Sequence, residues 1–130
     1  MIRNRMTEII DERIRNCDEL GDNWDYGINQ CHEEAITILT QNIDETMAYF
    51  LNDCTDEEFY WLSEIFEEII EKTQSQKLIQ TLRNRLEKVT CETYCQQNFK
   101  TEHMQKWVDY AEYVRSVKSE IDYAEEKIED

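Results

Sequence analysis

Residues 55–72, TDEEFYWLSEIFEEIIEK, decide the fold because they combine a complete helix start with a helical apolar pattern. Thr55 can accept a hydrogen bond from the backbone N–H of Glu58, and the Glu58 side chain can bond in return to the N–H of Thr55. The acidic residues of the first turn also suit the helix dipole. Apolar residues then recur every three or four positions, at Phe59, Leu62, Ile65, Phe66, Ile69 and Ile70. This spacing predicts one amphipathic helix from Asp56 to about Lys72.

Weaker signals predict further helices on both sides of this stretch. One is expected over about 5–18, ending near Gly21, and a loop at 22–27 follows whose two aromatic residues close the end of the core. Others are expected over about 28–40, from about 43 behind an Asn42 cap, and from 76 behind a Ser75 cap. The longest is expected from about Thr101, with a heptad-like seam of Trp107, Tyr110, Val114, Val117, Ile121, Ala124 and Ile128. We expect this seam to pack within the domain, and a homodimer through the C-terminal helix is the alternative.

The composition agrees with a single all-α domain over residues 1–130. The chain has no proline and two glycines, whereas a β-rich fold of this length needs more turn residues. We expect about five to six helices in a bundle or a short stack of helical pairs, with a long C-terminal helix. The N-terminal residues lack the apolar stretch of a signal peptide, and no segment is apolar enough to span a membrane. With an odd number of cysteines, five, we expect a cytoplasmic protein with reduced thiols.

The formal net charge of −16 is concentrated in one part of the chain. Residues 16–71 hold 16 acidic residues and no lysine or arginine, whereas the remainder holds 14 acidic and 14 basic residues. A surface of one sign repels itself and costs stability, but it also speeds the encounter with a basic partner. It disfavours nucleic acid and anionic membranes as partners. We therefore expect a basic protein partner, and a merely solvated acidic face is the alternative.

A helical projection of residues 56–71 suggests which side chains meet that partner. At about 100° per residue, Glu57, Tyr60, Glu64, Glu67 and Glu71 fall opposite the apolar stripe. Tyr60 is then a solvent-facing aromatic residue among carboxylates, where a partner's Lys or Arg could both pair with the acids and stack on the ring. The residues predicted to bind the partner are Asp53, Asp56, Glu57, Tyr60, Trp61, Glu64, Glu67, Glu68 and Glu71.

Patterns for catalysis are mostly missing, so we expect neither an enzyme nor a cofactor. His32 and His103 form neither a Glu-x-x-His nor a His-Glu-x-x-His pattern. Cys91 and Cys95 could share a helix face, but together with His103 they would supply only three ligands, too few for a structural zinc site.

The best enzymatic alternative uses Glu64-x-x-Glu67 and Glu68-x-x-Glu71. These carboxylates resemble the Glu-x-x-Glu motif of the all-α, Mg²⁺-dependent nucleotide pyrophosphohydrolases. The second half of that family's pattern, Glu-x-x-Asp, is absent at the expected distance, because Thr90 stands three residues after Glu87. The spacing alone leaves open whether the carboxylates of Glu64–Glu71 bind a metal.

The run FLNDCTDEEFYWLSEIFEE at residues 50–68, in a small, acidic, helical chain, resembles helical immunity proteins of bacterial polymorphic toxin systems, including contact-dependent growth inhibition. The likeness covers about residues 30–90. Proteins of this kind neutralise cognate toxins, often basic nucleases, by tight binding in the cytoplasm. The resemblance implies an inhibitor of a basic toxin domain, and the segregated charge of the chain predicts that it binds through the 16–71 block. A DNA-mimic inhibitor or a helical adaptor would also fit an acidic helical chain.

Overall fold

The described part of the chain is helical throughout, with turns between the helices. The computed structural model describes residues 2–20, 25–96, 99 and 102–129, and the side chains of these except 16–20, 25–29, 102 and 103. No strand occurs among them, so the expected all-α class is confirmed. None of the helices in these ranges is long and apolar enough to cross a membrane.

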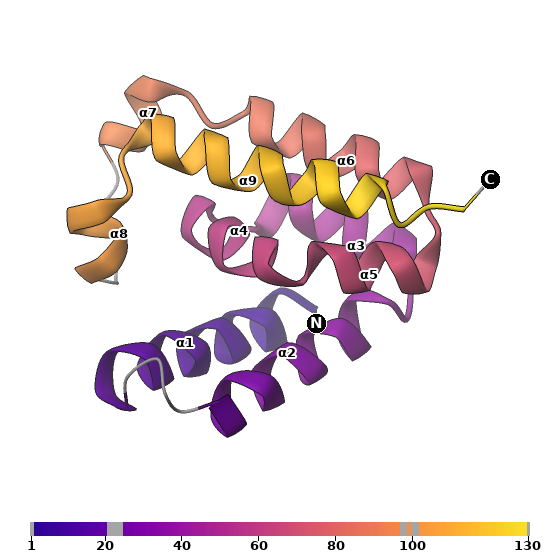
Figure 1. Ribbon diagram of the computed structural model, residues 1–130, viewed down its shortest axis with the longest axis horizontal. Coiled ribbons are helices and arrows are strands. Elements are labelled where there is room, and N and C mark those ends of the chain that lie inside the picture. The colour runs from indigo at the N-terminus through magenta and orange to yellow at the C-terminus, as the bar shows by residue number, and fades with distance from the viewer. Residues whose placement is uncertain (1, 21–24, 97–98, 100–101, 130) are drawn as a thin grey trace.

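The helices form three layers (Figure 1). In chain order they are α1 (Ile2–Leu20), α2 (Asp25–Leu39), α3 (Ile43–Ala48), a π-helical turn (Tyr49–Asp53), α4 (Asp56–Leu62), a 3-10 turn (Ser63–Ile65), α5 (Phe66–Thr73), α6 (Gln76–Glu87), α7 (Cys91–Cys95), α8 (Glu102–Trp107) and α9 (Tyr110–Glu125). The antiparallel pair α1–α2 forms one outer layer, and α9 packs against α5 and α6 on the other side. The segment from α3 to α5 lies between them, so α4 is covered from two directions.

The core of the middle layer is aromatic. Tyr49, Phe50, Phe59 and Phe66 are fully buried, and Tyr113 joins them from α9. The ring centroids of Phe50 and Phe66 are 6.1 Å apart in an edge-on arrangement, and those of Phe59 and Phe66 are 5.4 Å apart. Such pairs contribute about 0.5–1.5 kcal/mol each beyond the area that they bury. This cluster holds the elements of the acidic block against α9.

The predicted helix caps are confirmed. Thr55 Oγ1 accepts from the Glu58 N–H at 3.1 Å, and the Thr55 N–H donates to the Glu58 carboxylate at 3.2 Å, which completes the capping box. Asn42 and Ser75 cap α3 and α6 through single side-chain bonds of 3.2 and 3.0 Å. Local sequence therefore sets these helix starts.

The predicted helix over residues 56–72 is present without a break but is not α-helical throughout. It tightens into a 3-10 turn at Ser63–Ile65, where the Ser63 hydroxyl donates to the Tyr60 carbonyl at 2.6 Å. Because a 3-10 turn advances by about 120° per residue rather than about 100°, three such residues rotate the α5 face by about 60° relative to α4. A single helical projection across 56–71 is therefore wrong.

The C-terminal helix also begins later than predicted. The chain breaks between α8 and α9, and Asp109 caps α9 by accepting from the Glu112 N–H at 2.8 Å. Trp107, placed in the seam by its spacing, is 73% exposed. The buried seam consists of Tyr113, Val117, Ile121 and Ala124, all inside the domain. Val117, Ile121 and Ala124 of the predicted seam pack inside the domain, Tyr113 is buried in place of Val114, and the predicted start of the helix is wrong.

Two smaller expectations also need correction. Residues 25–27, expected in a loop, belong to α2, and the short helix α7 was not predicted. Residues 21–24, which include the expected helix end at Gly21 and the first part of the expected loop, lie outside the described residues.

Candidate functional site

The predicted partner-binding residues have three different environments. Some bond within the domain, some are buried, and the remainder lie at the surface. The expectation that Glu57 faces solvent is wrong. Glu57 is 7% exposed, because α4 lies in the middle layer between the two outer layers. Trp61, expected at the edge of the apolar stripe, is also buried, at 5% exposed.

Asp56 faces the interior, where it forms an ion pair with Arg85 of α6. An Arg85 guanidinium nitrogen lies 2.5 Å from the Asp56 carboxylate and 2.9 Å from the Cys54 carbonyl oxygen. The Tyr113 hydroxyl donates to the Asp56 backbone carbonyl at 2.6 Å. These bonds join the start of α4 to α6 and α9, so Asp56 stabilises the packing of these three helices.

Glu64 joins α1 and α2 to the middle layer. Arg13 bonds to both of its carboxylate oxygens, at 2.8 and 3.2 Å, and His32 Nε2 lies 2.9 Å from one of them. The Arg13 guanidinium also stacks over Trp61, 4.7 Å from the ring centroid. Burial by itself would raise the pKa of Glu64, but the hydrogen bonds from His32 and Arg13 outweigh it and the pKa is lowered. This carboxylate is therefore ionised and already neutralised by the protein.

A buried carboxylate that was not among the predicted site residues lies nearby. Glu58 is 7% exposed and accepts from the Tyr49 hydroxyl at 3.1 Å and from the Thr7 hydroxyl at 2.9 Å, besides closing the cap at Thr55. Burial raises the pKa of Tyr49 far above its usual value, so this hydroxyl remains a donor. Through these hydrogen bonds, Glu58 connects α1 and the π-helical turn to the start of α4.

The acids that remain at the surface form a strip along α5 and α9. Of the predicted acids from Glu64 onward, all four are at least partly exposed, and Glu64 is the one that pairs with Arg13. Helix α9 adds Glu120, whose pKa is raised by partial burial and by the charges of Glu67, Glu64 and Glu68. Among the described residues, none of Glu67, Glu68, Glu71 and Glu120 forms an ion pair. We call Glu67, Glu68, Glu71 and Glu120 the carboxylate strip.

Tyr60 lies near Glu64 and Glu112, outside this strip, and is not the solvent-facing aromatic residue that was expected. It is half-buried, because its ring packs 5.7 Å from Tyr113 of α9 and 5.8 Å from Trp61. Burial raises its pKa, and the charges of Glu112 and Glu64 raise it further. Tyr60 is therefore close to carboxylates, as predicted, and one of them comes from outside the acidic block of the sequence.

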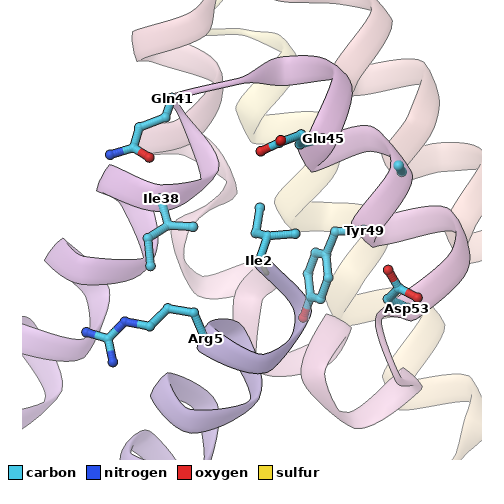
Figure 2. A pocket seen from close by; sticks show the side chains of 8 residues that line it. Ile2, Arg5, Ile38, Gln41, Glu45, Tyr49 and Asp53 are labelled. Atoms are coloured by element: carbon cyan, nitrogen blue, oxygen red, sulfur yellow. The ribbon is translucent and has the colours of Figure 1, made fainter.

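Asp53 belongs to a different surface, a groove between the start of α1, the end of α2 and α3 (Figure 2). The groove has a volume of about 570 Å³. Its apolar residues are Ile2, Ile38, Ala48 and Tyr49, and its polar residues are Arg5, Gln41, Glu45 and Asp53. Figure 2 shows Ile2 and Tyr49 in the middle, with Arg5 and Asp53 on opposite sides. We call this feature the α1–α3 groove.

The π-helical turn shapes this groove. The Cys54 N–H donates to the Tyr49 carbonyl at 2.8 Å, a bond across five residues rather than four. The wider turn carries Tyr49 and Asp53, which both line the groove. Single π-helical turns inside α-helices occur frequently at functional sites. No residue pattern in the sequence predicted this turn.

Metal-binding geometry is not evident in the described part of the chain. It contains no group of three or more His, Cys, Asp or Glu side chains placed to hold an ion. Cys91 and Cys95 are free and exposed on α7, and the His103 side chain lies outside the described residues. Glu64, the first carboxylate of the hydrolase-like pattern, points at Arg13 instead of forming a site with Glu67.

Comparisons with protein-family models, with curated proteins and with solved structures found no match to this chain. The surfaces of the protein itself are therefore the basis for assigning a function.

Proposed function

We propose that the protein binds a basic protein partner in the cytoplasm and neutralises its activity, as the immunity proteins of bacterial toxin systems do. The observation that carries this proposal is the carboxylate strip, whose four acids form no ion pair among the described residues. Other acids of the same block, such as Glu64 and Asp56, are neutralised by Arg13 and Arg85. The fold thus pairs some of its acids with arginine and leaves the four acids of the carboxylate strip at the surface.

Electrostatic repulsion among the acids of the strip favours the binding of a cationic partner. Partial burial, and then the charges of Glu67, Glu64 and Glu68, raise the pKa of Glu120. The ionised form of Glu120 therefore makes the free protein less stable. Lysine or arginine side chains of a partner would relieve this repulsion on binding. The same negative field accelerates the encounter with a basic protein and makes its rate depend on salt.

Half-buried Tyr60 adds an aromatic contact near Glu64 and Glu112, outside the carboxylate strip. Its ring is held by Tyr113 and Trp61, so its orientation is largely fixed before a partner arrives. A preorganised aromatic residue next to charge is a common centre of binding energy at protein interfaces. An arginine of the partner could stack on the accessible part of this ring.

Affinity capture tests this proposal. The tagged protein is incubated with its native cell lysate at low and moderate salt, and the retained proteins are identified by mass spectrometry. The activity of each retained protein is then assayed with and without the tagged protein. We expect one basic protein that is inhibited on binding. Its identity also separates a toxin domain from a DNA-binding protein.

A pair of matched variants connects the result to the strip. Glu67→Lys and Glu68→Lys together should slow association and weaken its salt dependence. Glu87→Lys and Glu92→Lys change the charge equally at exposed positions at the end of α6 and in α7 and should have a smaller effect. Retention of no basic protein, or equal association rates of the two double variants, would contradict the proposal.

A further inference from the structure

We propose that the α1–α3 groove binds an apolar peptide segment flanked by Lys or Arg, contributed by the same basic partner. This inference rests on the proposed function, which it extends by naming the kind of segment that anchors the partner. The carboxylate strip accounts for attraction at long range, whereas the groove offers a hollow with an apolar floor.

The floor of the groove suits apolar side chains. Ile2 and Ile38 are half-buried and Ala48 is exposed, and the buried Tyr49 ring lies beside Ile2 (Figure 2). The Tyr49 hydroxyl is fixed by its 3.1 Å bond to Glu58, so the floor is rigid. Burial of the remaining exposed area of these residues by an aliphatic side chain is favourable.

The charges around the groove select a cationic segment. Glu45 and Asp53 lie on the rim and form no ion pair among the described residues. Arg5, the one cation of the lining among the described residues, already bonds to Glu8 at 3.2 Å and to Glu34 at 2.8 Å. An anionic ligand would therefore meet uncompensated carboxylates, and a lysine or arginine would find them available.

A second hollow extends the groove along α2. It has a volume of about 370 Å³, shares Arg5 and Ile38 with the groove, and adds Glu33, Glu34 and Thr37. From Glu33 to Gln41 the two hollows follow α2 for about 12 Å. That length matches about four residues of extended chain or about two helical turns. The occupant is thus a short segment and not a whole domain face.

Two measurements test the groove. The first titrates ¹⁵N-labelled protein with an acetylated heptapeptide of four leucines and three lysines, and then with the same peptide carrying serine for leucine. We expect the leucine peptide to shift amide signals of the groove, and the serine peptide to bind at least about tenfold more weakly. The second measures the affinity of the captured partner for Ala48→Trp, which fills the groove from an exposed position, and for Glu45→Lys with Asp53→Lys. We expect each to bind at least about tenfold more weakly.

The outcomes separate this inference from the proposed function. If the partner is captured and inhibited, but the groove variants bind it as the wild type does, the groove inference fails and the proposed function stands. If no basic partner is found, the proposed function fails, and the peptide titration alone decides the groove. Equal binding of the leucine and serine peptides, or shifts outside the groove, would overturn it. So would self-association of the wild type that Ala48→Trp abolishes, because a second copy would then occupy the groove.

Discussion

Replacement of Arg85 by methionine should destabilise the protein far more than an equal replacement two residues earlier in the same helix. Arg85 is 6% exposed, pairs with Asp56, bonds to the Cys54 carbonyl and lies over the Phe59 ring at 5.3 Å. Methionine keeps most of the side-chain packing on Phe59 and removes the charge and the donors. The variant therefore isolates the polar contacts of Arg85.

The expected cost follows from these contacts. Breaking a buried ion pair by removing one partner costs about 3–5 kcal/mol, because the other charge stays buried. The lower end of that range, about 3 kcal/mol, applies here since Asp56 lies in the first turn of α4, where the helix dipole stabilises a carboxylate. The unsatisfied Cys54 carbonyl adds about 1 kcal/mol. Arg85→Met should thus lose about 4 kcal/mol from a total stability of about 5–15 kcal/mol.

Urea unfolding followed by circular dichroism measures this loss by linear extrapolation. Arg83→Met is the matched control, because Arg83 pairs with Asp122 and Glu125 at 3.0 and 3.1 Å at a partly exposed position. Its loss should stay below about 1 kcal/mol. Adding Asp56→Asn to Arg85→Met should recover about half of the cost, since no buried charge is then left unpaired. Equal losses for Arg83→Met and Arg85→Met would refute this account of the core.

The carboxylates and thiols of the protein allow three more tests. Since the pKa of Glu64 is lowered in the folded state, its ionised form adds stability above its usual pKa of 4.5, and this stability is lost as the pH falls through the lowered value; Glu64→Gln should therefore flatten the stability profile below pH 4.5. The pKa of Glu120 is raised, first by partial burial and then by neighbouring acids, so its ionised form costs stability at neutral pH; Glu120→Gln should raise the urea midpoint at pH 7, a pH below 4.5 should remove the gain, and added salt should reduce it by screening the neighbouring acids. Cys91 and Cys95 are exposed and should react with a thiol reagent in the native protein, whereas Cys54, whose pKa burial raises, should react only after unfolding; peptide mapping by mass spectrometry distinguishes the sites, and rapid native labelling of Cys54 would contradict the buried position.

The candidate site was only partly predictable from sequence. The excess of acids in residues 16–71 correctly indicated carboxylates on α5, because Glu67, Glu68 and Glu71 lie in a short helix whose apolar face is clear. Glu120 was missed since it belongs to a segment with balanced charge and joins the strip only when α9 packs on α5. The break before α9 had a usable local signal, an Asp109 cap three residues before Glu112, which the heptad-like spacing obscured.

The sequence by itself determined what depends on neighbours along the chain. The all-α class, the caps at Asn42, Thr55 and Ser75, and the apolar stripe of each helix follow from bonds and spacings within a few residues.

Only the tertiary structure decided which acids are compensated and which stay at the surface. Arg13 and Arg85 lie 51 and 29 residues from the carboxylates of Glu64 and Asp56 that they neutralise. The groove likewise combines α1, α2 and the π-helical turn. Electrostatic and packing energies depend on distance in space, and helix packing brings together residues that periodicity along the chain cannot relate.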